Sequence, residues 1–284
     1  MSFASLRHTI NSMNAVATQN ASPDPIVGGR IFTKAEPLAP PLATFTVSAR
    51  GKSPERPIFA YLKSQYGNLP LGEIESLFGF VEPSTLYGGR AFKKRELSDR
   101  DVLQLNNAGI GLRIPMSNHK VEAEEYEQSL PLLEKYHRDG NSIITTNDDL
   151  AQWIRRDFPN YKLDASVIKN INTYRKINKA LQIYDSVVLP MHSNEDFNFL
   201  QGIEAKDQII LFANAGCALT CPSHLCYPSV SKLNKFKGGE FRCSQPLKKR
   251  ELLGMVDFPL QPYIDLGFHQ FKLLRARPGG MTGF

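Results

Sequence analysis

From residue 44 onward, short apolar segments alternate with stretches in which apolar residues recur at the spacing of a helix. The pattern predicts strands at 45–49, 73–80, 110–116, 142–145, 162–167, 186–189, 208–212 and 271–274. It predicts helices at 56–66, 97–108, 122–136, 147–158, 174–183, 195–201 and 260–266. Alternating strands and helices form a parallel sheet with crossover helices, and eight such units close into a barrel of about 250 residues. The predicted fold class is therefore α/β, a (β/α)8 TIM-like barrel with room for irregularity in its first third.

Residues 1–43 differ in composition from the rest of the chain. They are rich in Ser, Asn, Ala, Thr and Pro, and they close with the segment PLAPP at 37–41. This composition predicts a disordered or extended N-terminal arm that ends in a stiff proline linker. The expected organisation is an arm at 1–43 and a single barrel domain at 44–284, which contains a cysteine-rich loop at 213–243.

The overall composition is that of an ordinary globular protein, with 42% hydrophobic and 22% charged residues. No apolar run approaches the roughly 20 residues that cross a bilayer, so no membrane span is expected. A net charge of +6 is compatible with a polyanionic partner such as RNA, and equally with a basic surface that keeps the chain soluble. Four cysteines are too few for a secreted disulfide scaffold, and thiolate ligands suit a reducing compartment, which favours the cytoplasm.

All four cysteines fall in one short window, at Cys217, Cys221, Cys226 and Cys243, with the spacing C-x3-C-x4-C-x16-C. Four thiolates are the full ligand set of an iron–sulfur cluster or of a tetrahedral zinc ion. Zinc ribbons usually have two C-x2-C pairs, and this chain has none. The preferred interpretation is an iron–sulfur cluster, followed by structural zinc and then by unligated or disulfide-bonded cysteines. His224 lies within the window and is expected to support the site rather than to replace a thiolate.

Polar residues at strand ends are candidates for chemistry, because βα barrels carry their active sites at the C-terminal ends of the strands. Asn214 and Gly216 precede the first cysteine; Gly216 is expected to adopt a positive φ and Asn214 to hold the loop. Arg113 and Lys272 lie in strands and are expected to point into the barrel mouth, where they would bind a carboxylate or a phosphate. The alternative for both is an exposed or snorkelling side chain.

His192 follows the strand at 186–189 and is a candidate acid/base or substrate-binding residue. The alternative is that the segment serves only to begin the next helix. In that case Ser193 or Asn194 would cap the helix, and the acidic residues after them would favour its N-terminal end.

Three stretches resemble the U32 peptidase family: VVLPMHSNEDFNFLQGI at 187–203, IILFANAGCALTCP at 209–222 and YIDLGFHQFKLLRAR at 263–277. The resemblance covers about half of the chain, roughly 142–277. It implies a barrel with a 4Fe–4S cluster on Cys217, Cys221, Cys226 and Cys243. It also implies oxygen-independent hydroxylation, or a related modification, of RNA or a small aromatic substrate, with prephenate as the oxygen source in that family.

Two other functions stay open at the level of sequence. The first is a non-catalytic subunit with a protein partner, in which zinc or a cluster only staples the loop and adds folding energy. The second is a peptidase, which rests on the name of the family, because the chain has neither a G-x-S-x-G nor an H-E-x-x-H motif.

Overall fold

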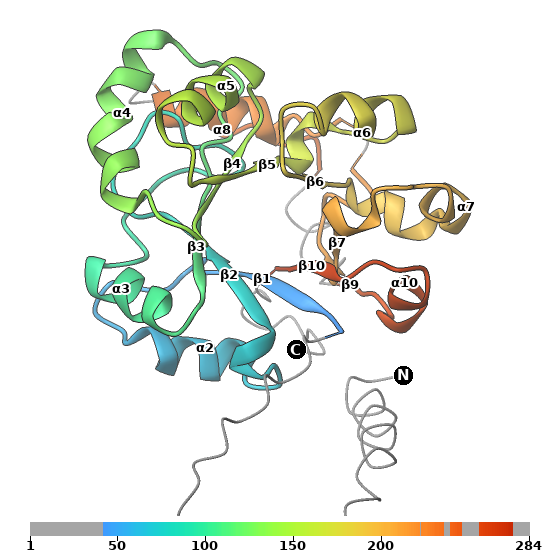
Figure 1. The fold of residues 1–284 in the computed structure, drawn as a ribbon. Helices are drawn as coiled ribbons and strands as arrows, with labels where there is room; N and C mark the ends of the chain where they lie inside the picture. The colour runs from blue at the N-terminus through green and yellow to red at the C-terminus, as the bar shows by residue number, and fades with distance from the viewer. Residues whose placement is uncertain (1–41, 222, 236–238, 246–255, 275–284) are drawn as a thin grey trace, which may run out of the picture.

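The structure is a computed structural model that describes residues 42–221, 223–235, 239–245 and 256–274. Eight strands pair in parallel and close into a barrel in the order β1-β10-β7-β6-β5-β4-β3-β2, with helices arranged around it (Figure 1). The strands are β1 (Thr44–Ser48), β2 (Ile74–Phe78), β3 (Gly111–Ile114), β4 (Ser142–Thr145), β5 (Lys162–Ala165), β6 (Ser186–Val188), β7 (Ile209–Phe212) and β10 (Gln270–Leu273). The predicted TIM-like α/β fold is confirmed. The predicted arm at 1–43 lies outside the described residues, except for its last two.

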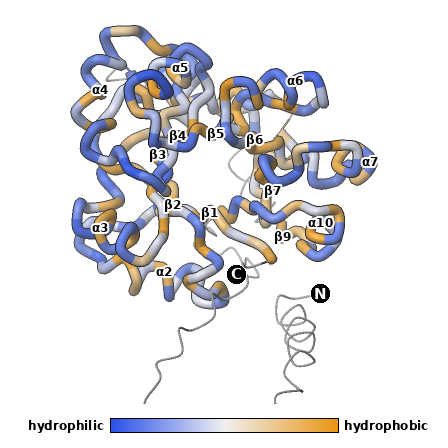
Figure 2. The backbone as a smooth tube through the Cα atoms, viewed as in Figure 1, coloured by the Kyte–Doolittle hydropathy of each residue, from blue (hydrophilic) through white to orange (hydrophobic). Residues whose placement is uncertain are grey.

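The helices bury one face against the barrel. They are α2 (Ile58–Tyr66), α3 (Asp99–Asn107), α4 (Ala123–Tyr136), α5 (Asp148–Asp157), α6 (Tyr174–Ala180), α7 (Phe197–Gln201), α8 (Cys226–Lys235) and α10 (Gln261–Asp265). Figure 2 shows hydrophilic and hydrophobic segments alternating along the outer helices, as expected for helices with one buried face. None of the helices in the described ranges is both long enough and apolar enough to cross a membrane.

The helix starts follow from local chemistry. The Ser98 hydroxyl accepts a hydrogen bond from the Asp101 N–H, and the Asp101 carboxylate accepts one from the Ser98 N–H, so α3 begins with a capping box. The Asn147 side chain accepts from the N–H of Leu150 and caps α5. At α7 the cap is Asp196, whose carboxylate accepts from the N–H of Phe199. The predicted capping by Ser193 or Asn194 is therefore wrong, because the chain first makes the 3-10 helix η4 (Met191–Glu195).

The interior of the barrel is polar. Alternate strand residues point inward, and the Thr46 hydroxyl of β1 lies 3.0 Å from the Ser76 hydroxyl of β2. The other buried polar residues of the strands include Ser48, Arg113, Ser142, Asp164, Ser186 and Lys272. The apolar residues between them, such as Val47 and Leu112, are fully buried. Hydrophobic packing thus holds the barrel from outside, and its centre is left for charged and hydroxyl groups.

Two strands and one helix of the described residues depart from the predicted pattern, and all three lie around the cysteines. The short strand β8 (Asn214–Ala215) pairs antiparallel with β9 (Val256–Asp257) at the end of β7. The cysteine segment, expected as a loop, contains the helix α8. A two-residue strand is too short to produce a periodic pattern, and its pairing is non-local, so the sequence alone does not reveal it.

Candidate functional site

A cavity opens at the carboxyl ends of the strands, the face on which βα barrels carry their chemistry. It encloses about 1080 Å³ of empty space, including the part open to solvent. Its wall is contributed by strands around the barrel, through residues that include Ser48, Phe78, Ile144, Phe212 and Lys272. Arg50 and Arg90 also line it, and none of the described lining residues is acidic. The mouth therefore combines aromatic surface with positive charge, a combination that suits an anionic ligand.

Lys272 of β10 is buried in this wall, with 7% of its surface exposed. Its ammonium nitrogen lies 4.5 Å from the centre of the Phe78 ring. Burial, followed by the positive charge of Arg113, lowers the pKa of Lys272 to about 7, although Asp164 acts in the opposite direction. The expected inward position of Lys272 at the mouth agrees with this placement.

Arg113 lies deeper in the barrel, below the cavity wall. Its Nε lies 2.9 Å from Asp164 Oδ2 and 2.9 Å from the Ser142 hydroxyl, and the side chains of Arg113 and Asp164 are each 2% exposed. The Ser186 hydroxyl donates a hydrogen bond to Asp164 Oδ1. Within the described residues, Arg113 Nη1 has no hydrogen-bond partner, and Asp164 Oδ2 has only its ion-pair contact with Arg113 Nε. Arg113 thus faces inward, as expected, but it pairs with Asp164 and is not among the described residues that line the cavity, where it was expected to bind a carboxylate or a phosphate.

Arg90 is held rigidly at the cavity wall. It pairs with both carboxylate oxygens of Glu96, and its guanidinium stacks 3.9 Å from the centre of the Phe80 ring. Glu96 also accepts from the backbone N–H groups of Gly51 and Phe80. One buried carboxylate therefore fixes the loops after β1 and β2 together with the arginine.

The loop after β2 also needs a glycine. A Cβ on Gly88 would lie 2.0 Å from the carbonyl oxygen of Ser117, so no other residue fits there without a backbone shift. Both residues line the cavity, and their close approach shapes this part of its wall.

The cysteine segment lies at the rim of the same cavity. Cys217 lines the cavity, and Cys226 begins α8. Burial raises the pKa of Cys226 to about 11, and the charges of Cys217, Cys243 and Cys221 act in the same direction. The four thiols are thus near enough to interact electrostatically, and none of them is in a disulfide.

The thiols do not, however, take up the geometry of a metal site. Across the described ranges, no three His, Cys, Asp or Glu side chains stand at metal-ligand distances. Charges act on one another over distances longer than a metal–sulfur bond of about 2.3 Å. The electrostatic effect of the other thiols on Cys226 is therefore compatible with the lack of a metal-site arrangement in the described ranges. Cys221 Sγ lies 3.5 Å from the Ser244 hydroxyl, and Cys243 Sγ accepts from the N–H of Gln245. Four thiols are the donor set of a four-thiolate group, but in the described residues they do not stand in the arrangement of such a site.

Helix α8 fastens the cysteine segment over the barrel mouth. Its Asn234 side chain donates to the carbonyl of Tyr87 and accepts from the N–H of Phe92, both in the loop after β2. Its Ser231 carbonyl accepts from Asn118, which follows β3. These contacts connect the cysteine-bearing helix to loops that are far away in the sequence.

The structure agrees with the expectation for Asn214 and differs from the expectation for Gly216. The Asn214 side chain accepts from the N–H of Leu274 and donates to its carbonyl, so it joins the cysteine loop to the end of β10. The expected holding role of Asn214 therefore agrees with its contacts. The expected positive φ of Gly216 is wrong: the segment stays in an extended pairing through β8, and the left-handed conformation falls instead on His224, with φ of 47°. Gly216 lines the cavity.

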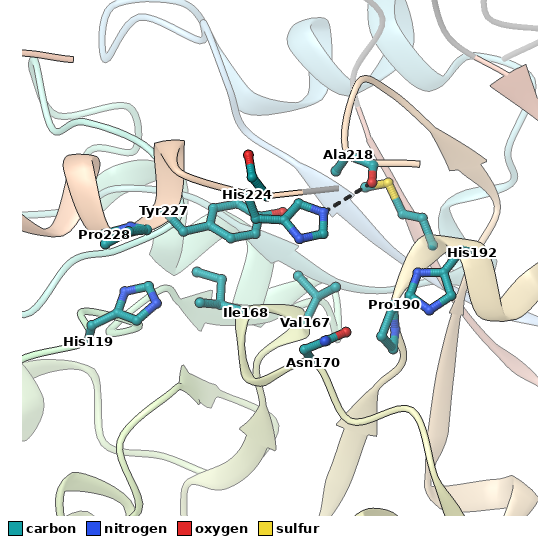
Figure 3. Close-up of a pocket in the computed structure, with 12 residues that line it drawn as sticks. His119, Val167, Ile168, Asn170, Pro190, His192, Ala218, His224, Tyr227 and Pro228 are labelled. Carbon is teal, nitrogen blue, oxygen red and sulfur yellow. Dashed lines mark hydrogen bonds between the residues drawn. The ribbon is translucent and has the colours of Figure 1, made fainter. Parts of the chain in front are cut away.

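His192 is exposed on η4 and lines a second, smaller cleft of about 570 Å³ of empty space. Figure 3 shows His192 and His119 at opposite ends of this cleft. His224 lies between them, donates from Nε2 to the Ala218 carbonyl at 3.2 Å, and stacks on Tyr227. Ala218 and Tyr227 line both cavities, so the smaller cleft continues into the barrel mouth. His192 is thus placed beside the main cavity, away from Lys272.

Three residues of the site went unrecognised in the sequence: Asp164, Arg90 and Glu96. Asp164 carried a signal, since an acidic residue between Leu163 and Ala165 in a strand points to a buried partner. Arg90 and Glu96 lie in an irregular segment after β2, and nothing in their spacing indicates that they pair.

No family model and no curated protein matches the sequence. Among solved structures, the fold is similar to one described as the structure of the U32 peptidase Mk0906. The two share a TM-score of 0.56 and 11% sequence identity, over 90% of this chain and 98% of that chain. At that identity the likeness concerns the fold alone: the chain is a closed α/β barrel of the kind found in a U32 peptidase.

Proposed function

We propose that the protein is an iron–sulfur enzyme in which Cys217, Cys221, Cys226 and Cys243 hold a 4Fe–4S cluster beside a substrate cavity. The observation that carries the proposal is that Cys217 lines the cavity, while the charges of Cys217, Cys221 and Cys243 all act on the pKa of Cys226 in the same segment. Four cysteine thiolates are the usual ligand set of such a cluster. A group held there would adjoin any molecule in the mouth.

The cavity suits a small aromatic acid or a single RNA base. Phe78 and Phe212 offer aromatic surface, and the guanidinium groups of Arg50 and of the Glu96-paired Arg90 lie at the wall. Asn214 holds the cysteine loop against β10, which keeps Cys217 at the cavity wall. A cluster at this place would supply electron transfer or Lewis-acid activation. The protein residues bind and orient the substrate.

The reaction class that we propose is oxygen-independent hydroxylation, in line with the sequence resemblance to the U32 family. A hydroxyl-bearing organic acid such as prephenate would supply the oxygen. The exchange replaces a hydrogen of the aromatic substrate by hydroxyl and the hydroxyl of the donor by hydrogen, so it needs no net oxidant. The positive mouth is suited to both the donor and an acidic substrate, because both carry carboxylates.

A second candidate is a non-catalytic subunit in which the metal site only stabilises the folded cysteine segment. Two large apolar residues of the cysteine segment favour a protein partner, since Leu225 is 51% exposed and Phe241 is 47% exposed. A peptidase function rests on the name of the structural neighbour alone.

An oxygen-free turnover assay tests the proposal. Anaerobically purified protein, reduced with dithionite, is incubated with prephenate and either 4-hydroxybenzoate or bulk transfer RNA. Products and digested nucleosides are then analysed by mass spectrometry. The proposal expects a product that gains one oxygen atom and that is absent with Cys217→Ser. No product with either substrate, or equal product with Cys217→Ser, would contradict it. The Asn198→Ala variant, altered at an exposed position of α7, is the matched control.

A further inference from the structure

We propose that Lys272 is a nucleophile that forms a reversible imine with a small α-keto acid bound in the barrel mouth. This activity goes beyond the proposed function, because it needs neither a cluster nor any other metal. Its ligand class is defined by two features, a reactive carbonyl group and an adjacent carboxylate.

The position of Lys272 is that of an inward-facing residue at the end of a closing strand. Lys272 pairs with Thr46 of β1 on one side and Phe212 of β7 on the other. Its side chain lines the cavity, and its nitrogen faces the Phe78 ring at 4.5 Å. Among the described residues, no side chain or carbonyl hydrogen-bonds to this nitrogen. The amine is therefore directed at the cavity and is not engaged in an ion pair.

The charges around Lys272 favour its neutral form. Asp164, the acidic residue that acts on it, is already paired with Arg113 at 2.9 Å. The carboxylate of Asp164 therefore does not offset the charge of Lys272 alone. Burial and the nearby charge of Arg113 lower the pKa of Lys272 to about 7. A lysine that is desolvated or placed near a second cation is the arrangement that makes amines nucleophilic at neutral pH. Surface lysines such as Lys162, which is 62% exposed, lack these conditions.

The cavity is equipped to hold the carboxylate of an α-keto acid. Arg50 lines its wall beside Arg90, whose guanidinium is paired with Glu96, and the hydroxyl residues Ser48, Ser117 and Ser166 line it as well. The lining contains no acidic side chain among the residues that the structure describes. A carboxylate is therefore attracted to the same space into which the Lys272 amine points.

The covalent step is balanced without any co-reactant. The neutral amine adds to the carbonyl carbon, and the carbonyl oxygen takes up a proton to give a carbinolamine. The carbinolamine then loses its hydroxyl group, which leaves as water with the second amine proton, and a carbon–nitrogen double bond remains. The open cavity supplies and receives the protons through solvent, and no atom changes its oxidation state overall.

Reductive trapping tests the inference. The full-length protein is incubated at pH 7 with pyruvate and sodium cyanoborohydride, and peptides are mapped by mass spectrometry. We expect a reduced pyruvyl adduct on Lys272, formed at least about tenfold faster than on Lys162, because the neutral fraction of an ordinary lysine is small at pH 7. Adducts on exposed lysines with Lys272 unmodified would overturn the inference, as would a complete absence of adduct. Mapping in the unaltered protein makes the test independent of whether Lys272 variants fold.

Two further measurements separate this inference from the proposed function. The same trapping after anaerobic removal of iron with a chelator should give an undiminished adduct on Lys272, since the imine needs no cluster; loss of the adduct would contradict the inference. Benzoate, a carboxylate without a reactive carbonyl, should slow the labelling of Lys272 by competition and leave that of Lys162 unchanged. Equal labelling with and without benzoate would show that the reaction occurs without a carboxylate site.

Discussion

The side chain of Asn214 is joined to the backbone of Leu274 by two hydrogen bonds, of 2.8 Å from its N–H and 3.0 Å to its carbonyl. Leu274 follows the last strand of the barrel, and Asn214 begins the segment that carries the cysteines. This pair of bonds fixes the start of the cysteine segment to the strand that bears Lys272. The metal-site candidate and the cationic cavity thus share one attachment point.

Replacing Asn214 by Ala should lower the free energy of unfolding by about 1–3 kcal/mol, because it leaves two backbone groups of Leu274 without partners. Denaturant unfolding of the purified protein measures this change. Asn198→Ala, at an exposed position of α7, is the control and should change stability by less than about 0.5 kcal/mol. Equal effects of the two substitutions would show that the Asn214 bonds contribute nothing.

The buried pair of Arg113 and Asp164 gives a larger prediction. Asp164→Asn removes the negative charge and leaves the Arg113 guanidinium buried and uncompensated, which should cost about 3–5 kcal/mol of unfolding free energy. Glu75→Gln is the matched control, since Glu75 lies 3.7 Å from the exposed Lys162, and such surface pairs contribute less than about 1 kcal/mol. A small effect of Asp164→Asn would show that the charges are solvated rather than enclosed.

The pKa of Lys272 predicts a pH dependence of stability. Its pKa is lowered to about 7 in the folded protein, against about 10.4 in the unfolded chain. Between these values the unfolded chain binds the extra proton, so stability rises with pH from about 7 toward 10, by at most about 1.4 kcal/mol per pH unit. Lys272→Met should remove this rise.

Unfolding free energies measured between about pH 6 and pH 8.5 check this prediction. In that window the difference between the two proteins isolates Lys272 from the other titrating groups. Parallel curves for the unaltered protein and Lys272→Met would contradict the lowered pKa.

Gly88 tests the shape of the cavity wall. Gly88→Ala places a methyl group 2.0 Å from the carbonyl oxygen of Ser117, and the resulting overpacking should cost about 1–3 kcal/mol or more. Gly72→Ala is the control, because nothing lies within 4 Å of the added carbon there. Thermal unfolding of both variants measures the difference. An unaffected Gly88→Ala protein would mean that the loop after β2 can move away without cost.

The eight barrel strands were predictable because each is a short apolar segment between polar turns, and in the structure each lies within a few residues of its predicted place. The N-caps at Ser98 and Asn147 were predictable because the capping residue and its helix are adjacent in sequence. Local patterns of this kind survive folding, since they depend on neighbouring residues only.

The features that escaped prediction depend on contacts between distant segments. Only closure of the barrel brings Arg113 of β3 beside Asp164 of β5. The pairing of β8 with β9 is just two residues long and spans the cysteine segment, and it keeps Gly216 out of the left-handed conformation that its sequence context suggested. The grouping of the four cysteines in one segment is read directly from the sequence, whereas the identity of what they bind depends on chemistry that both iron and zinc satisfy.

The most direct test of the central claim is a metal and sulfide analysis of the anaerobically purified protein, together with its visible spectrum. Ligation of a cluster by four cysteines predicts about four irons and about four acid-labile sulfides per chain, with a broad absorbance at about 400 nm that bleaches on reduction. Serine at any of the four positions should lower the iron content. A colourless protein with about one zinc per chain, or one without metal, would contradict the account.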